Sequence, residues 1–256
     1  MSKYIITIDV GNTNISVIVF DATNANILEK KKYRTEDVKK GTLYKDFLDF
    51  KDKYVVGCAY ISSVVPKANK KISEALEELD IKPTFINPLD YQDIMQLDVR
   101  GKEELGSDIF CGCVESLKYA PSTITIDMGT AITIALVKDS KFYACAIFPG
   151  TYLSFSSLSN NTALLDQVKL EEPKNMFQGD TTDALQTGMI FGISGAIREI
   201  VNKYLEVASD AKVIFTGGDG IRYVKYFQNA LYEANLIHLG LLDIYIRRNG
   251  IQKWLI

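Results

Sequence analysis

The chain has 256 residues, 47% of them hydrophobic, and a formal net charge of −3. This composition can fill one large or two medium-sized cores, and the charge excludes the broad basic field used to bind nucleic acid or anionic lipid. No apolar run approaches the roughly 20 residues of a membrane span, and the N-terminus enters a strand without a secretory leader. We therefore expect a cytoplasmic protein that binds neither nucleic acid nor membrane.

The cysteine and histidine content limits metal and redox chemistry. The four cysteines (Cys58, Cys111, Cys113 and Cys145) form no Cys-x-x-Cys pair, and His238 is the single histidine. A zinc site of the usual kind is therefore not expected, and a chain of this length needs no disulfide framework, so we expect free thiols. A Ser-His-Asp triad would need His238, which lies in the apolar stretch NLIHLGLL, and we do not assign it a catalytic role.

The first half of the chain opens with three consecutive β-type segments. Residues 4–8, 15–20 and 27–34 are predicted to form an antiparallel meander. The segments that follow are a helix near 43–50, a buried strand at 55–61, an amphipathic helix at 67–80, a short strand at 84–86 and a helix at 107–120.

After Pro121 the same order begins again. Another meander is predicted at 124–126, 132–137 and 142–148, then helices at 152–159 and 183–207, a buried strand at 213–216 and a last helix at 241–250. The repeated order predicts duplicated α/β domains with mixed sheets, residues 1–120 and 121–256, packed around a cleft.

A doubled phrase marks the start of each half. ITIDVGNTNISVIVFD begins at Ile6 and ITIDMGTAITIALVKD at Ile124. Glycine in each turn, Gly11 and Gly129, permits a tight reversal and close approach of a ligand to the backbone. The polar residues beside them, Asn12, Thr13 and Thr130, can help cradle phosphate oxygens.

Each hairpin also carries an aspartate at the end of its first strand. Asp9 and Asp127 could hold Mg²⁺ directly or through water. Two such hairpins facing each other would grip a triphosphate from both sides. Asp-x-Gly is also an ordinary hairpin signal, but two extended copies followed by matching elements favour the nucleotide interpretation.

Two glycine motifs follow in the second half. In VIFTGGDG, a buried strand ends at Gly217 and Gly218, which either border a flat ligand such as adenosine or form an ordinary turn. Gly188, Gly192 and Gly195 recur at helical spacing, which predicts a flat helix face on which another element packs closely. A Walker-type phosphate loop and a Gly-x-Gly-x-x-Gly fingerprint are missing from the sequence.

Asp108, in EELGSDIF, begins a predicted helix. It is either an N-terminal cap or first-turn acid favoured by the helix dipole, or a general base facing the cleft. The two roles are compatible with each other.

Together these motifs resemble the type III pantothenate kinases, of the acetate-kinase/sugar-kinase/heat-shock/actin superfamily. The resemblance runs nearly end to end and rests on DVGNTN, ISSVVP, LGSDIF, IDMGTAIT, IFPG, NNTALL, TTDALQTGMIFGISG and FTGGDG in that order. It implies duplicated ribonuclease H-like, actin-like ATPase domains that flank a nucleotide cleft.

The resemblance also implies a reaction: ATP-dependent phosphorylation of pantothenate to 4′-phosphopantothenate, the first step to coenzyme A. It further implies Mg²⁺, a monovalent cation (K⁺ or NH₄⁺) and a homodimer. Asp108 would be the base and Asp9 and Asp127 the metal ligands. The implied nucleotide and phosphate contacts are Asp9, Gly11, Asn12, Thr13, Gly129, Thr130, Thr133, Gly217 and Gly218, and the implied substrate contacts are Gly106, Ser107 and Thr181.

The sequence departs from the family pattern on the substrate side. Ile109 stands where the family has arginine after the motif aspartate, and Ala144-Cys145 replaces a Gly-Gly pair. Two alternatives therefore stay open beside pantothenate kinase: a nucleotide-binding relative that acts as a regulator, and a kinase of the same fold for another small hydroxyl substrate.

Overall fold

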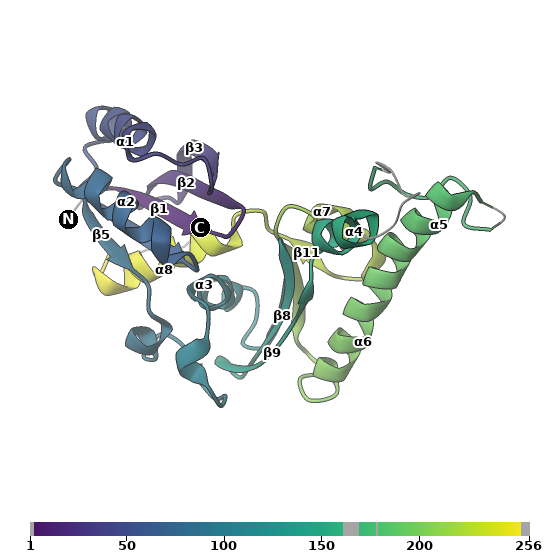
Figure 1. Ribbon diagram of the computed structural model, residues 1–256. Helices are drawn as coiled ribbons and strands as arrows, with labels where there is room; N and C mark the ends of the chain where they lie inside the picture. Colours follow the sequence, from purple (N-terminus) through teal and green to yellow (C-terminus); the bar gives the residue numbers. More distant parts are fainter. Residues whose placement is uncertain (1–2, 161–168, 178, 252–256) are drawn as a thin grey trace. The chain divides into compact units, whose positions relative to one another are not determined.

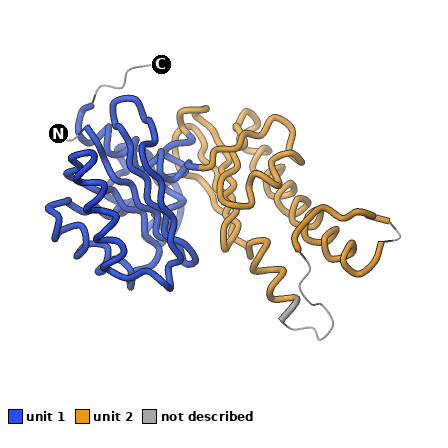
Figure 2. Tube along the Cα trace, turned by 90° about the horizontal axis from the view of Figure 1, so that it is seen from above, with its two compact units in different colours: residues 1–116, 235–256 blue, residues 117–234 orange. Residues whose placement is uncertain are grey.

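The computed structural model describes residues 3–160, 169–177 and 179–251. The chain forms two compact units (Figure 2). Unit 1 comprises residues 1–116 together with 235–256, and unit 2 comprises residues 117–234. The C-terminal segment therefore belongs with the N-terminal part of the chain.

Unit 1 is built on a mixed sheet with the strand order β3-β2-β1-β4-β5. Strands β1 to β3 form the antiparallel meander that the sequence predicts, and β4 and β5 continue the sheet in parallel with β1. The strands are β1 (Tyr4–Val10), β2 (Asn14–Asp21), β3 (Asn26–Arg34), β4 (Cys58–Ser63) and β5 (Lys82–Phe85).

Helices cover both faces of this sheet (Figure 1). Ile6, Ile8 and Val10 of β1 share one core with α1 and α2. Because side chains alternate along a strand, Thr7 and Asp9 point to the opposite face, where α3 and α8 pack. The helical elements of unit 1 are α1 (Lys40–Tyr54), α2 (Pro66–Glu77), η1 (Pro88–Tyr91), η2 (Lys102–Glu104), α3 (Ser107–Ser116) and α8 (Leu236–Arg248), with a short strand β6 (Gln96–Leu97) between η1 and η2.

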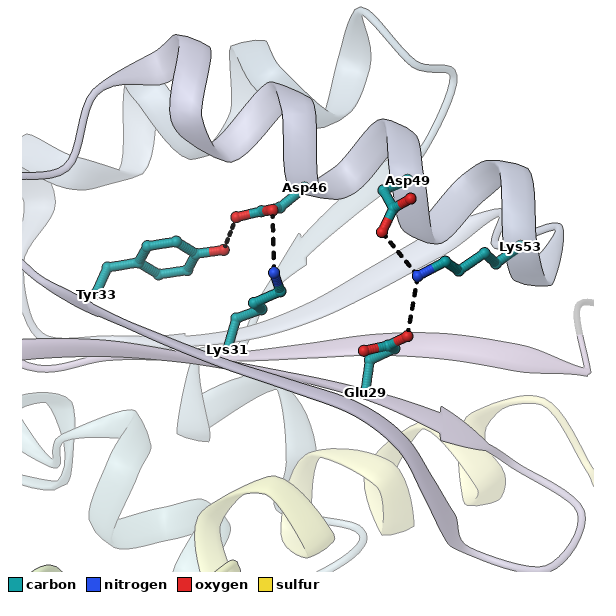
Figure 3. Close-up of polar contacts among 6 residues, drawn as sticks. All are labelled: Glu29, Lys31, Tyr33, Asp46, Asp49 and Lys53. Carbon is teal, nitrogen blue, oxygen red and sulfur yellow. Dashed lines mark hydrogen bonds and ion pairs between the residues drawn. The ribbon is translucent and has the colours of Figure 1, made fainter.

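A polar layer joins α1 to β3 (Figure 3). Asp46 accepts a hydrogen bond from Tyr33 Oη at 2.5 Å and pairs with Lys31 at 3.4 Å. Lys53 pairs with Asp49 at 2.9 Å and with Glu29 at 3.2 Å. These contacts raise the pKa of Lys53 to about 12, with Asp49 contributing most. Exposed pairs of this kind contribute little to stability, so the layer chiefly fixes the orientation of α1.

Unit 2 repeats this plan. Its strands follow the order β11-β10-β7-β8-β9, with β7 and β8 antiparallel and β10 parallel to β7. Ile124, Ile126 and Met128 of β7 share a core with the helical segment after residue 188. The elements are β7 (Thr123–Met128), β8 (Ala131–Lys138), β9 (Lys141–Pro149), α4 (Thr151–Asn160), α5 (Thr181–Thr187), η3 (Gly188–Gly192), α6 (Ile193–Leu205), β10 (Lys212–Thr216), α7 (Gly220–Tyr223), η4 (Val224–Tyr226) and β11 (Leu231–Tyr232).

The predicted fold class, α/β with duplicated mixed sheets, is confirmed. Several element boundaries differ from those predicted, as three examples show. The strand predicted from residue 55 begins at Cys58, because Val55 ends α1 in a left-handed conformation (φ 51°). The helix predicted over 107–120 ends at Ser116, and the last helix begins at Leu236 rather than at residue 241.

The helix predicted over 183–207 is also not uniform. A π-helical turn, η3, interrupts it between α5 and α6. There Ser194 Oγ donates to the Ile190 carbonyl at 2.7 Å, and such a bond back to the preceding turn distorts helices.

The described residues leave the glycine face uncovered, since nothing lies within 4 Å of a Cβ placed on Gly188, Gly192 or Gly195. The expected close packing on this face is therefore wrong for the described chain.

The two compact units differ from the predicted domains 1–120 and 121–256 at the C-terminus. Helix α8 packs on α3, β1 and β4 of unit 1, although it follows unit 2 in sequence. No helix in the described part of the chain combines the length and the apolar character needed to cross a membrane.

Candidate functional site

The first predicted phosphate turn joins β1 to β2. The Gly11 N–H donates to the Asn14 carbonyl at 2.9 Å and closes the turn. Thr35 holds the turn from the side: its hydroxyl donates to the Gly11 carbonyl at 2.7 Å and its N–H to the Thr13 carbonyl at 3.0 Å. Asn12 and Thr13 are exposed at the tip, where a ligand can reach them.

Asp9 lies beside this turn, near the end of β1. It stands opposite Ser16 of β2 on one side and Ser62 of β4 on the other. This central position fixes its backbone on both sides.

Gly106 and Ser107 prepare the start of α3. A Cβ on Gly106 would collide with the Asp108 carboxylate, so glycine at this position leaves room for that group. Ser107 is buried: its Oγ accepts the Ser63 N–H at 2.9 Å and lies 3.0 Å from Ser62 Oγ. In unit 1, therefore, Ser107 anchors α3 to the end of β4.

Asp108 is partly buried in the first turn of α3. Burial raises the pKa of its carboxyl group, although the Ile109 N–H donates to Oδ1 at 2.8 Å and acts in the opposite direction. A raised pKa makes the carboxylate a better proton acceptor. The position of Asp108 thus supports its interpretation as an acid in the first turn of α3. The same position is compatible with a role as general base.

The buried thiol of Cys111 is influenced electrostatically by both Asp108 and Asp9. Burial raises the pKa of this thiol, and the negative charges of Asp9 and Asp108 raise it further. Asp9 stands opposite Ser62 of β4, and Ser62 Oγ lies 3.0 Å from the Oγ of Ser107, the residue before Asp108. The two predicted residues occupy one region of unit 1.

The second predicted turn joins β7 to β8 in unit 2. It is one residue shorter than the first, and the Gly129 N–H donates to the Ala131 carbonyl at 3.0 Å. Asp127 stands opposite Thr133 of β8 and Thr216 of β10. Gly129 and Thr130 are exposed at the tip. The structure thus brings Asp127, Gly129, Thr130 and Thr133 together in one hairpin, and their role in phosphate binding stays a prediction.

The FTGGDG segment closes against this second hairpin. Gly217 has a φ of 79°, and a Cβ there would collide with the Asp127 carboxylate and the Met128 backbone. Gly218 is exposed, with open space beside its Cα. The first glycine therefore serves close packing on Asp127, while the second leaves the surface free for a ligand.

Sequence reasoning missed Gly150, which also supports the second turn. Its N–H donates to the Thr130 carbonyl at 2.9 Å, and a Cβ would strike the backbone of Gly129 and Thr130. The Pro-Gly pair in IFPG was the available signal, because glycine after proline commonly marks a tight approach.

Thr181 is the exposed first residue of α5 in unit 2. Asp183, two residues further along α5, ties this helix to the preceding loop, and sequence reasoning also missed it. The buried Asp183 carboxylate accepts the Lys174 N–H at 2.8 Å and the Asn175 N–H at 3.2 Å, and Asp180 caps the helix. The predicted NNTALL motif lies, from Asn161 onwards, outside the described residues.

The aspartates at the two turns suit a magnesium ion better than a structural metal such as zinc. Among the described residues, no group of three or more histidine, cysteine, aspartate or glutamate side chains is placed to hold a metal. The cysteines, as predicted, are free thiols. Mg²⁺ usually takes one or two carboxylates together with phosphate and water oxygens, which matches single aspartates beside phosphate-type turns.

Comparison with known proteins bears on the family of the chain. The sequence profile of the type III pantothenate kinase family matches residues 5–203. A type III pantothenate kinase of Dictyoglomus turgidum is 30% identical over 255 residues, covering 95% of this chain and 99% of the relative.

Solved structures show the same fold. A Campylobacter jejuni protein described as a candidate Baf-family transcriptional activator has a TM-score of 0.62 at 20% identity, covering 96% of this chain and 100% of that one. A Sinorhizobium meliloti protein described as a candidate 2-dehydro-3-deoxygalactonokinase has a TM-score of 0.62 at 12% identity, covering 98% of each chain. With the profile match and the full-length relative, these findings lead to one conclusion: the chain belongs to the type III pantothenate kinase family.

Proposed function

We propose that the protein phosphorylates pantothenate with ATP to give 4′-phosphopantothenate, the first step of coenzyme A biosynthesis. The observation that supports the proposal is that this family member has both Asp-x-Gly hairpins, and that Asp108 follows Ser107, whose Oγ lies 3.0 Å from the Oγ of Ser62, the cross-strand partner of Asp9. Phosphoryl transfer needs phosphate binding, charge neutralisation and a proton acceptor, and these residues can supply all three.

Asp108 accepts the proton of the attacking hydroxyl group. The hydroxyl oxygen forms a bond to the γ-phosphorus, the bond to the β,γ-bridging oxygen breaks, and ADP leaves. Because the Asp108 carboxylate accepts the Ile109 N–H in the space left by Gly106, it is oriented before the substrate binds. Such positioned proton acceptors contribute about 10²–10⁴-fold to rate.

The turns bind the phosphate groups. Asn12, Thr13 and Thr130 are exposed residues at the tips of the two hairpins, and Gly218 offers an open surface for the nucleoside. The Asp9 carboxylate of the first hairpin and the Asp127 carboxylate of the second would each supply oxygen ligands for Mg²⁺, which would neutralise phosphate charge.

A second candidate is a kinase for another small hydroxyl compound. Ile109 favours it, because an apolar side chain stands where the family resemblance expects a cation beside the base. A regulatory relative that binds nucleotide without turnover is the third reading, and the presence of Asp108 and Asp127 disfavours it.

One assay separates these candidates. Purified protein with Mg-ATP and K⁺ is given pantothenate or simple sugars, ADP release is followed, and the product is identified by mass. Release with pantothenate alone supports the proposal. Release with another compound alone favours the second candidate, and nucleotide binding without ADP release favours the regulator. Asp108→Asn run in parallel identifies contaminating kinase activity.

We also propose a cytoplasmic homodimer that uses K⁺ or NH₄⁺. The open glycine face of Gly188, Gly192 and Gly195 and the part-exposed Phe191 beside it offer a flat apolar surface in unit 2. Light scattering at assay concentration tests the dimer, and a fully active monomer would contradict it. Replacing K⁺ by Na⁺ in the assay tests the cation.

A further inference from the structure

The single histidine of the chain joins the strands of the first phosphate hairpin. His238 lies on α8 and is 5% exposed. Its Nδ1 is 2.8 Å from Thr7 Oγ1 of β1, and its Nε2 is 2.7 Å from Ser16 Oγ of β2. One imidazole ring therefore bridges both strands and ties them to a helix from the other end of the chain.

The bridge lies directly behind the predicted phosphate turn. Ser16 is the cross-strand partner of Asp9, and Thr7 lies two residues before Asp9 on the same face of the sheet. The turn at Gly11–Asn14 begins two residues after Asp9. Movement of β1 relative to β2 at this level would therefore displace both the carboxylate and the turn.

The hydrogen bonds indicate where the ring proton lies. Thr7 Oγ1 donates to the Ile18 carbonyl at 3.3 Å. Because a hydroxyl group has one proton, Thr7 then accepts from Nδ1–H, and Nε2 accepts the Ser16 proton. All partners are satisfied by a neutral ring. Burial, assisted by the positive charge of Lys30, lowers the pKa of His238 to about 3, in agreement with this assignment.

The same helix also supports α3, which carries Asp108. A Cβ on Gly240 would collide with the Cys111 carbonyl, so α8 and α3 meet backbone to backbone. Leu236 lies 3.7 Å from a Cβ built on Gly112. Helix α8 is thus a common support for the first phosphate hairpin and for the helix of the base.

We infer that His238 is a positioning residue for nucleotide binding: it fixes the β1–β2 turn to α8 through Thr7 and Ser16 and exchanges no proton with the substrate. The inference rests on the proposed function only in taking this turn to bind nucleotide phosphate. It predicts that loss of the bridge weakens nucleotide binding more than it slows phosphoryl transfer.

Three substitutions separate the two hydrogen bonds. In His238→Asn the amide can replace Nδ1 toward Thr7, and in His238→Gln it can replace Nε2 toward Ser16, while His238→Phe keeps the ring volume and loses both bonds. Calorimetry with Mg-ADP, without pantothenate, measures binding. We expect Kd to rise about fivefold for each single loss, equivalent to one typical hydrogen bond, and about 25-fold for His238→Phe.

A matched control distinguishes positioning from general destabilisation. Leu236→Val perturbs buried packing of the same helix against α3 and should lower Tm while leaving the Mg-ADP Kd within twofold. In the His238 variants, KM for ATP should rise with kcat within about threefold, and hydrogen exchange of the Gly11 amide should accelerate. If the His238 variants lower Tm without changing Kd, as Leu236→Val does, the inference is wrong.

Two further measurements keep the test decisive. If the His238 variants do not fold, Ser16→Ala removes one bond from the other side and should give the same fivefold rise in Kd; an unchanged Kd would overturn the inference. Nitrogen NMR of the single histidine should show a neutral ring protonated at Nδ1 at pH 7, and a cationic ring would overturn it. A wild-type chain that binds Mg-ADP but does not phosphorylate pantothenate contradicts the proposed function alone.

Discussion

The two Asp-x-Gly hairpins share a sequence phrase but are supported in different ways. The first, between β1 and β2, is held by side chains: the imidazole of His238 behind it and the hydroxyl of Thr35 beside it. The second, between β7 and β8, is held by backbone approach, with Gly150 and Gly217 placed where any side chain would collide with the turn.

The shared sequence motif therefore determines the turn. Residues elsewhere in the chain determine how each turn is supported. Side-chain bracing adds hydrogen bonds that a single substitution can remove. Close approach of glycine, with the backbone hydrogen bond from Gly150 to Thr130, makes the second turn intolerant of added volume. The first hairpin also shares its unit with Asp108, the proposed proton acceptor. The variants below test each part of the contrast.

The largest effect is expected at Asp108. Asp108→Asn should lower kcat about 10²–10⁴-fold, because the proton acceptor is lost, while Tm stays close to wild type, since asparagine serves almost as well at a helix start. Glu103→Gln, an exposed acid on η2, is the control. Steady-state kinetics and thermal melting of both variants test the assignment, and an unchanged kcat would remove Asp108 from the mechanism.

The pH profile sharpens this prediction. Burial raises the pKa of Asp108, so the basic form is lost as pH falls through a value above the ordinary aspartate pKa of about 3.9. The wild-type kcat should show this acid limb, and the residual activity of Asp108→Asn should lack it.

The next effect separates the two kinds of support. Gly217→Ala should lower the free energy of unfolding by about 2 kcal/mol or more, because it combines a left-handed φ with overpacking against Asp127. Gly11→Ala should cost much less, since its Cβ would meet only the Asn14 carbonyl, at 3.3 Å. Urea denaturation of both variants measures the difference, and equal costs would contradict the contrast.

Removal of each turn aspartate comes third. Asp9→Asn and Asp127→Asn should each raise the Mg²⁺ concentration needed for half-maximal activity, by about 10- to 100-fold, as changes around metal sites commonly do. Asp139→Asn is a matched control at the exposed β8–β9 turn, where asparagine tolerates the positive φ of 50°. Full activity of both variants at limiting Mg²⁺ would refute the role of the two hairpins.

A pH dependence of stability is also expected from the histidine behind the first hairpin. His238 has a pKa of about 3 when folded and about 6.5 when unfolded, so only the unfolded chain binds this proton between those values. The stabilisation is complete above pH 6.5 and is lost as pH falls toward 3. The stability advantage of wild type over His238→Gln should shrink by about 1.4 kcal/mol per pH unit between pH 6 and 4. A constant difference would show that the ring is not buried in solution.

Sequence reasoning predicted the local part of this architecture. Both meanders, both turns and the start of α3 follow from strand alternation, turn residues and an acid in a first helical turn, all within a few residues of one another. Asp127 and Thr133, for example, pair across a hairpin whose register is set by the turn itself.

Features that depend on contacts between residues far apart in sequence could not be predicted from local sequence patterns. His238 meets Thr7 across 231 positions of sequence, and its apolar neighbours indicate only a buried helix. The placement of α8 in unit 1 has the same origin. Gly217 was recognised as a turn glycine, but its collision with Asp127 depends on the parallel pairing of β10 with β7.

The return of α8 to unit 1 has a consequence for biosynthesis. The ribosome makes residues 117–234 before it makes the helix that covers the Thr7 and Ser16 face of the first sheet. At typical elongation rates this takes about 6–24 s. During that time the nascent first unit lacks its closing helix, so we expect unit 2 to complete its folding first and chaperones to engage the uncovered sheet until translation passes Arg248.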